Sequence, residues 1–163
     1  MRRKFSDGLL DYVHILDCLG LRSGQVVLDA GCGSGYMSRK FSKRVGSAGK
    51  VYAIDIEKIT VETLRREAAE TNIIPLVADI TGPTSFGNDL FDVIYLSTVF
   101  HIFSTNQIRS FTQEIRRISK PGGKLAVVTF KKEDVPFGPP VEMRDSPEDL
   151  KRKIYLPPLA LVE

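Results

Sequence analysis

The sequence of 163 residues predicts an α/β fold, a Rossmann-like three-layer sandwich with a mostly parallel central sheet. Two observations predict this fold. Short β-branched and apolar runs alternate with segments of helical periodicity, and the first such run enters a glycine-rich turn. Hydrophobic residues make up 42% of the chain and charged residues 26%, which is typical of a folded globular protein rather than a disordered or fibrous one. The length suits one core.

The first half of the chain is expected to form two helices and two strands. Ser6 can cap a first helix that Gly20 would end, with apolar residues at helical spacing: Leu9, Leu10, Val13, Leu16 and Leu19. Residues 26–28 predict a buried strand that ends at Asp29. A helix over 34–45 and a second strand over 51–54, ending at Asp55, follow.

The second half continues the alternation. After a helix with apolar Val61, Leu64, Ala68 and Ala69, a third strand is expected over 75–78, and Pro75 weakens its first position. A fourth strand over 91–96 precedes a helix that the capping box Ser104-Thr105-Asn106-Gln107 opens. A turn over 121–123 delivers a fifth strand over 125–130. Ser146 and Pro147 open a last helix, after which there is room for one strand at most.

Charge and composition narrow the class of protein. The net charge of +3 comes from short, scattered basic clusters that are typical of solvated helix faces, so a nucleic-acid partner is not expected. No segment approaches the ~18 continuous apolar residues of a membrane span, and acidic residues interrupt the apolar stretch after the basic start. We therefore expect a cytoplasmic protein without a membrane partner.

The two cysteines, Cys18 and Cys32, are too few for a disulfide framework, and with two histidines they show no metal-ligand spacing. Reduced thiols and no structural metal are expected. Cys18 is assigned to the core side of the first helix, and Cys32 to packing within the glycine-rich turn.

Three acidic positions follow three successive predicted strands. Asp29 precedes Gly31, Gly33 and Gly35, whose missing side chains let the backbone turn sharply and approach a ligand. Asp55 lies 20 positions after Gly35, where a carboxylate can accept both hydroxyl hydrogens of a ribose. Asp79 could accept a hydrogen bond from an adenine amino group. Parallel strands end at the same edge, so these residues outline one nucleoside-shaped crevice. The alternative roles are a tight structural turn for the glycines, a helix cap for Asp55 and a solvated loop position for Asp79.

The ordered segments VVLDAGCGSG, VYAIDIE, LVADIT, FDVIYLSTVFHIF and KPGGKLAVVTF closely resemble the class I S-adenosylmethionine-dependent methyltransferases, of the small type 11 and type 25 kind. The resemblance runs from Val26 to Phe130. It implies S-adenosylmethionine as the cofactor and one domain over 1–163. Within it, 1–22 would form the N-terminal helix, 23–130 the cofactor-binding core and 131–163 a substrate-side loop, helix and terminal strand.

The same resemblance assigns roles to individual positions. The three glycines would line the methionine moiety, with Asp29 holding its amino group through the loop and Asp55 the ribose. The residues implied near the adenine and the methionine end are Tyr36, Ile56, Asp79, Ile80 and Ser97.

A sulfonium methyl group is already activated, so in-line displacement needs mainly alignment and exclusion of water. If the acceptor carries a proton, His101 beyond the fourth strand is the candidate general base, although its apolar neighbours also suit a packing role. No Asn-Pro-Pro-Tyr-like motif follows the fourth strand and the cysteines are too few for a metalloid site, which leaves a small-molecule acceptor as the favoured class.

Three other functions stay open. A noncatalytic S-adenosylmethionine-binding module or partner subunit is one, and an RNA methyltransferase is another. A dinucleotide-binding protein is disfavoured because its fingerprint needs a third glycine where this chain has Tyr36. Related sheets close with a helix and two strands, the last antiparallel. The short end after Pro147 therefore predicts either a chain truncated relative to its relatives or a homo-oligomer that completes the sheet edge.

Overall fold

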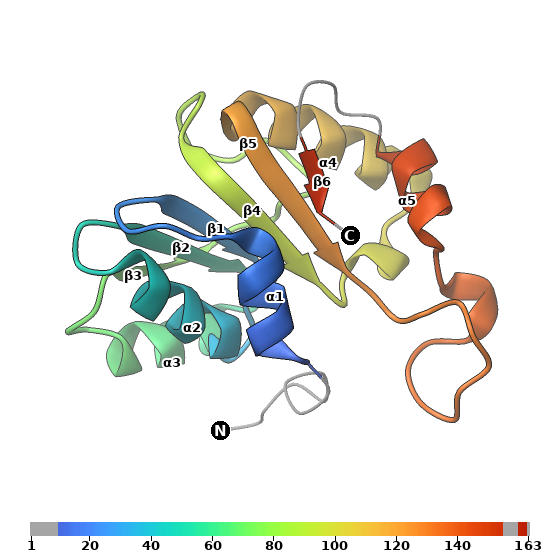
Figure 1. Cartoon of the computed structure of the whole chain (residues 1–163), viewed down its shortest axis with the longest axis horizontal. Helices are drawn as coiled ribbons and strands as arrows, with labels where there is room; N and C mark the ends of the chain where they lie inside the picture. Colours follow the sequence, from blue (N-terminus) through green and yellow to red (C-terminus); the bar gives the residue numbers. More distant parts are fainter. Residues whose placement is uncertain (1–9, 155–159, 163) are drawn as a thin grey trace.

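The computed structural model describes residues 10–154 and 160–162, and the predicted cap at Ser6 lies outside them. One sheet of six parallel strands runs through the molecule in the order β3-β2-β1-β4-β5-β6 (Figure 1). The strands are β1 Val26–Ala30, β2 Lys50–Asp55, β3 Ile73–Val77, β4 Phe91–Ser97, β5 Ser119–Val128 and β6 Ala160–Val162. The chain winds outward from β1 on one side and from β4 on the other. The predicted α/β three-layer fold is therefore confirmed, with its switch point between β1 and β4.

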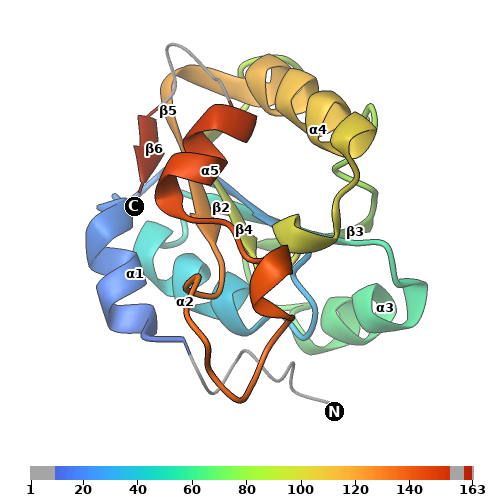
Figure 2. The same cartoon turned by 90° about the vertical axis from the view of Figure 1, so that its right-hand side faces the viewer.

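Helices cover both faces of the sheet. The helices α1 Tyr12–Leu19, α2 Tyr36–Val45 and α3 Lys58–Glu67 lie on one face, and α4 Thr105–Ile118 and α5 Pro147–Lys153 on the other (Figure 2). Two short 3₁₀-helices, η2 Phe100–Ile102 and η3 Val141–Met143, follow β4 and β5. None of the helices in the described part of the chain is long and apolar enough to cross a bilayer.

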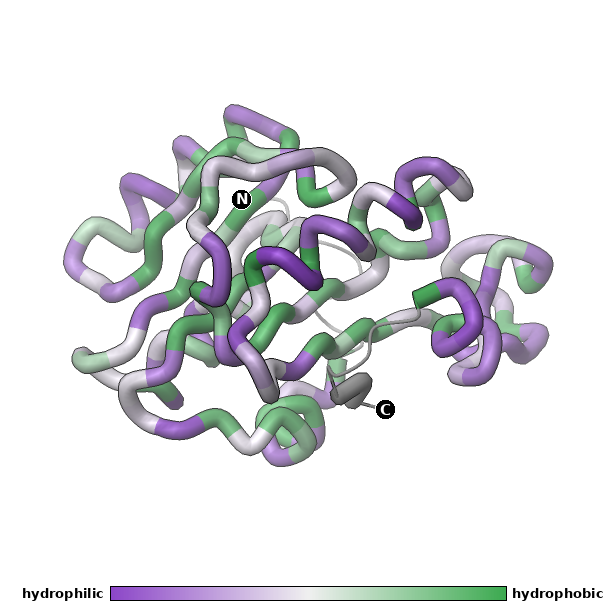
Figure 3. The backbone as a smooth tube through the Cα atoms, turned by 90° about the horizontal axis from the view of Figure 1, so that it is seen from above, coloured by the Kyte–Doolittle hydropathy of each residue, from purple (hydrophilic) through white to green (hydrophobic). Residues whose placement is uncertain are grey.

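Alternate residues of each strand supply two hydrophobic layers, as a period of two requires. Leu28, Ile94 and Leu96 pack beneath α4 and α5. Their neighbours Val27, Val93 and Tyr95 pack beneath the other three helices. Figure 3 shows the hydrophobic stretches along the strands and hydrophilic ones along the outer helical turns.

Several predicted helix ends are confirmed. Gly20 ends α1 in the left-handed conformation, at a φ of 57°, and Gly46 ends α2. Ser104 and Gln107 form the predicted capping box of α4. Ser146 caps α5 in the same way, with Asp149 as its partner.

The predicted inward face of α1 is wrong at Val13, which is half exposed, and at Cys18, which is exposed. The helix begins after the cap Asp11, and the residues that it turns toward the core are Tyr12, Ile15, Leu16 and Leu19. Successive residues of a helix are about 100° apart around its axis, so Val13 and Cys18 lie on either side of the face that these four residues form. Cys32 is buried, as expected.

Two strand boundaries also differ from those predicted. Strand β3 starts at Ile73, so Pro75 lies in its middle, which an edge strand tolerates. Strand β5 starts at Ser119 and includes the segment 121–123 expected as a turn, because Ser119 pairs with Phe91 before an irregularity in the register. It ends at Val128, so Thr129 and Phe130 lie beyond the strand.

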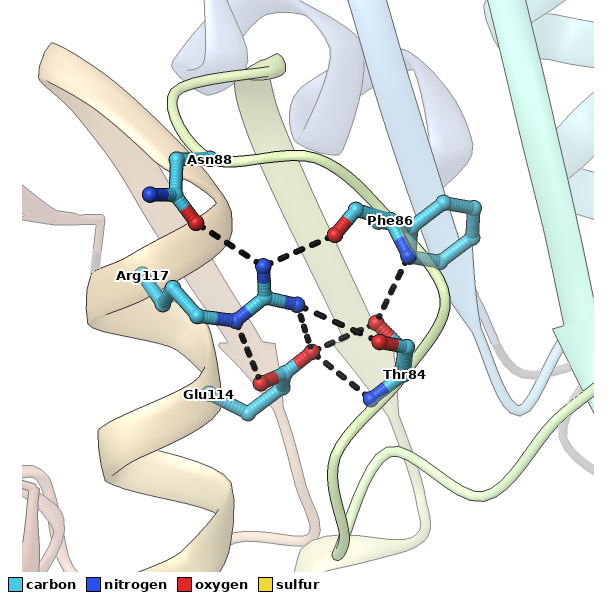
Figure 4. A network of polar contacts seen from close by, with 5 residues as sticks. All are labelled: Thr84, Phe86, Asn88, Glu114 and Arg117. Atoms are coloured by element: carbon cyan, nitrogen blue, oxygen red, sulfur yellow. Dashed lines mark hydrogen bonds and ion pairs between the residues drawn. The ribbon is translucent and has the colours of Figure 1, made fainter.

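A polar network fastens the loop after β3 to α4 (Figure 4). The buried carboxylate of Glu114 accepts hydrogen bonds from the backbone N–H of Thr84, at 2.9 Å, and from the Arg117 guanidinium. Arg117 also donates to the carbonyl of Phe86 and to the side chain of Asn88. Burial raises the pKa of Glu114, but the hydrogen bonds from Arg117 and Thr84 outweigh it, so the net pKa lies below its ordinary value.

Candidate functional site

The glycine-rich turn between β1 and α2 adopts a shape that other residues would disturb. Gly31, Gly33 and Gly35 have φ angles of 73°, 52° and 76°, in the left-handed region. A Cβ on Gly35 would lie 2.5 Å from Cδ1 of Leu64, and one on Gly31 would lie 2.8 Å from Cγ2 of Val99. The turn therefore needs glycine for its dihedral angles and for its close approach to neighbouring side chains.

Asp55, at the end of β2, binds this turn directly. Its Oδ2 accepts a hydrogen bond of 2.9 Å from the backbone N–H of Gly33, and its Oδ1 accepts one of 3.1 Å from Glu57. Glu57 occupies the N-cap position of α3, without a side-chain cap hydrogen bond, so Asp55 is not that helix's N-cap. A carboxylate has about four acceptor positions, so two bonds leave capacity for a ligand's hydroxyl groups.

Asp29 lies under the turn and is only 3% exposed. Its Oδ2 accepts a hydrogen bond of 2.5 Å from Oγ of Ser38, which is fully buried in α2. Ser38 was not predicted, because a serine inside a helix carries no signal until its partner across the turn is known. This hydrogen bond ties the end of β1 to α2 across the glycine turn.

The third acidic position lies at the rim of the same edge. Asp79 is exposed, and its Oδ1 accepts hydrogen bonds from the N–H and Oγ1 of Thr81, at 2.8 and 2.6 Å. The neighbouring Ile80 is 6% exposed and packs in the core, so its side chain is not free to cover a ligand.

Exposed apolar side chains gather beside Asp55. Ile56, directly after β2, is 72% exposed, and Ile59 in the first turn of α3 is 77% exposed. Val77 is 49% exposed and pairs with Asp55 in the sheet. Ile59 and Val77 were not predicted as site residues: the sheet register sets Val77 beside Asp55, and Ile59 follows Ile56 by three residues, in the first turn of α3. Together they offer an apolar surface for a flat ring.

The end of β4 lies next to the glycine turn, because Ala30 pairs with Leu96. Ser97 follows, and its Oγ is buried without a hydrogen-bond partner among the described residues. Thr98 has a φ of 56°, which is a strained conformation for a β-branched residue. Tyr36 opens α2 and contacts Tyr12 edge to face, with 6.3 Å between ring centroids. An unpaired hydroxyl and a strained residue at one strand end are typical of a ligand site.

His101 lies in η2, beyond β4, and is half buried. Its Nδ1 is buried and has no hydrogen-bond partner within the part of the chain that the structure describes. Burial lowers the pKa of His101, and the negative charge of Asp145 partly opposes this shift. Asp145 comes from the segment before α5, 44 residues further along the chain, so its proximity to His101 was not predicted.

The structure thus joins Gly31, Gly33, Gly35 and Asp55 directly and places Asp29 and Ser97 beside them. Asp79 and His101 lie on the flanks. No group of three or more potential metal ligands occurs over residues 10–154 and 160–162.

Comparison with known proteins identifies the family. A family described as a methyltransferase domain matches residues 27–123. The chain is 32% identical over 120 residues to the ubiquinone/menaquinone biosynthesis C-methyltransferase UbiE of Escherichia fergusonii, covering 72% of this chain and 47% of that protein. The chain therefore spans about half the length of the curated relatives it matches.

Solved structures share the fold. A SAM-dependent methyltransferase from Aquifex aeolicus superposes with a TM-score of 0.80 at 28% identity, over 94% of this chain and 81% of that one. An arsenic(III) S-adenosylmethionine methyltransferase from Chlamydomonas reinhardtii, at 24% identity and a TM-score of 0.57, covers 63% of this chain and 38% of its own, and shows the fold alone. The glycine turn and Asp55 both lie within the matched family region, and the chain belongs to the methyltransferase domain family, among the class I S-adenosylmethionine-dependent methyltransferases.

Proposed function

We propose that this chain transfers the methyl group of S-adenosylmethionine to a small-molecule acceptor by in-line displacement. The observation that carries the proposal is the hydrogen bond from the Gly33 N–H to Asp55. It places a carboxylate with free acceptor positions against a turn of glycines, whose backbone carries no side chains, at the switch point of the sheet. This hydrogen bond links the end of β2 to the glycine turn, where the proposed nucleoside site would have its centre.

The residues present fit this cofactor. Asp55 would bind the ribose hydroxyl groups. The buried carboxyl group of Asp29, directly before the turn that holds Gly31, Gly33, Gly35 and Tyr36, would help to hold the ammonium group of the methionine moiety. The unpaired Oγ of Ser97 offers a further polar contact at that end. Asp79 and the apolar surface of Ile56 suit an adenine ring, to which the buried Ile80 would contribute only its backbone.

When bound, S-adenosylmethionine supplies a methyl group on a positively charged sulfur, which makes the carbon open to displacement. The protein's part is to hold the acceptor in line and to exclude water. His101 would remove a proton from the acceptor, since burial keeps its imidazole neutral at lower pH than usual. The basic residues fall in short, scattered clusters along the sequence, which favours a small-molecule acceptor over RNA.

Calorimetry with Asp55 variants tests cofactor binding. Asp55→Ala removes both acceptor atoms and should weaken binding of S-adenosylmethionine and S-adenosylhomocysteine by about 1–3 kcal/mol, as expected for lost hydrogen bonds to a charged group. Asp55→Asn keeps one acceptor for the Gly33 N–H and should lose less. An unchanged affinity in a folded Asp55→Ala protein would show that Asp55 does not take part in cofactor binding.

Methyl transfer by His101→Gln tests the proposed base. In the wild-type protein the rate should fall on the acid side as pH drops through the lowered pKa of His101, because only the neutral imidazole accepts a proton. The variant should lose that acid limb and about 10²–10⁴ in kcat, with cofactor affinity unchanged. An unaltered kcat would leave His101 as a packing residue, and cofactor binding without turnover on any acceptor would favour a noncatalytic module.

A further inference from the structure

A cavity of ≈ 550 Å³ lies beside β5, between α1 and α5, outside the crevice described above. Its walls carry apolar side chains from three elements, among them Ile15 of α1, Val128 of β5 and Leu150 of α5. Phe130 and the charged Lys131, Lys132 and Glu133 line it where the chain leaves β5. Small-molecule sites measure about 300–1,000 Å³ and combine apolar walls with few polar groups, so size and lining both suit such a ligand.

The cavity lies next to the proposed site of methyl transfer. Val128, in its wall, pairs with Ser97 in the sheet, and the carbonyl of Val128 accepts a hydrogen bond of 2.8 Å from Thr98. Adjacent strands are about 4.8 Å apart, so the wall is one strand away from Ser97. Asp145 also lines the cavity, and its charge acts on His101. The cavity is therefore flanked by the residues expected around the reacting atoms.

A buried arginine holds the segment that shapes this side of the cavity. Arg144 is 3% exposed, and its guanidinium donates hydrogen bonds to the carbonyl oxygens of Lys131, Glu133, Phe137 and Pro139. It also lies over the ring of Phe130, 5.8 Å from the centroid. Two of these carbonyls belong to residues that line the cavity, so Arg144 fixes the segment in place rather than leaving it as an open loop.

We propose that this cavity binds the apolar part of the methyl acceptor. The acceptor is then a small molecule with a substantial hydrocarbon portion. Its reactive atom would reach over the ends of β4 and β5 to lie between Ser97 and His101. This inference rests on the proposed function and adds the chemical class of the acceptor.

A strand from a second copy, adding to the edge of β5, is the competing occupant. Strand β6 pairs with Lys124, Leu125 and Ala126, so at the carboxyl end of β5, beside the cavity, Val127 and Val128 alone extend beyond the paired stretch. Strands in globular proteins span about 3–10 residues, and two residues offer too short an edge. The apolar walls on both sides of that edge fit a compact ligand better.

The experiment uses 1-anilinonaphthalene-8-sulfonate, an aromatic anion that becomes fluorescent in apolar sites. Cys18 is exposed and lines the cavity, so Cys18→Trp should fill it without disturbing the core. Val13 lies on the same helix, half exposed and away from the cavity, which makes Val13→Trp the matched control. If Cys18→Trp fails to fold, the smaller Cys18→Leu replaces it.

The wild-type protein should bind the dye saturably, Cys18→Trp should weaken binding by about tenfold, and Val13→Trp should change it by less than about twofold. S-adenosylhomocysteine affinity, measured by calorimetry, should be the same in all three. The inference is overturned if the wild-type protein shows no saturable dye binding, or if the two variants bind the dye equally. A wild-type dimer that Cys18→Trp dissociates would assign the surface to a second copy. If S-adenosylhomocysteine fails to bind the wild type, the proposed function itself fails.

Discussion

The two ends of the proposed site are built differently. At the cofactor end, backbone N–H groups of the glycine turn and carboxylates at strand ends define the geometry, with Gly33 bonded to Asp55. At the acceptor end, irregular backbone after β5 is held by one buried cation, Arg144, and the walls are apolar side chains. The first arrangement fixes one ligand through the shape of the main chain. The second surrounds an apolar cavity with a fixed main-chain frame, which suits a ligand bound mainly through apolar contact.

The largest effect should come from breaking the backbone of the cofactor end. Gly35→Ala would place a side chain at a φ of 76° and against Leu64, so we expect the free energy of unfolding to fall by about 3 kcal/mol from backbone strain and overpacking together. S-adenosylhomocysteine binding should be lost with it. Chemical denaturation and calorimetry measure both.

Gly87→Ala is the control, since a Cβ there meets nothing within 4 Å. A Gly35→Ala protein as stable as this control would show that the turn tolerates a side chain, and the contrast between the two ends would weaken.

A smaller effect should follow at the acceptor end. Arg144→Leu leaves four carbonyl groups without their charged donor and should lower the free energy of unfolding by about 2 kcal/mol. Cofactor affinity should not change, whereas methyl transfer should suffer through a higher KM for the acceptor. Arg144→Lys keeps the charge without the planar fork and should recover only part of the loss. A fall in cofactor affinity would contradict the separation of the two ends.

The smallest effect concerns Glu114, which lies away from both ends. Glu114→Gln should cost about 1.5 kcal/mol at neutral pH, because hydrogen bonds to a charged acceptor are replaced by neutral ones. The pKa of Glu114 is lowered in the folded protein, so its contribution is present above the ordinary value of 4.5 and is lost as pH falls through the lower folded value.

The stability gap between wild type and Glu114→Gln should therefore narrow on acidification, as urea unfolding at several pH values would show. A gap independent of pH would mean that the carboxylate contributes through shape rather than charge. Cofactor affinity should be unaffected, which would show that Glu114 stabilises the fold and does not contribute to the proposed site.

Sequence reasoning recovered the features that depend on local chemistry. Gly20, Gly46 and the box at Ser104 ended or opened helices as predicted, because caps need specific residues at specific positions. It failed at Val13 and Cys18, since an eight-residue helix has too few turns for spacing alone to fix which side faces the core.

The acceptor end was the least predictable. A buried arginine that is bonded to carbonyl groups has no sequence signature. Arg144 cannot be told from a surface cation until the path of the segment after β5 is known. The contact between Asp29 and Ser38 and the apolar group of Ile56, Ile59 and Val77 likewise depend on tertiary packing. All predicted roles at the site stay predictions: His101 as the base, and as cofactor-binding residues Asp29, Gly31, Gly33, Gly35, Tyr36, Asp55, Ile56, Asp79, Ile80 and Ser97.

The side chain of Asp55 accepts a hydrogen bond from the backbone of the glycine turn, so a contact within the protein itself holds the turn. The turn is thus pre-organised, and a bound nucleoside has little main-chain freedom left to freeze. Exchange of the spent cofactor for a fresh one would then need no refolding of the turn, and the speed of that exchange should depend on contacts with the ligand itself rather than on slow rearrangement of the protein.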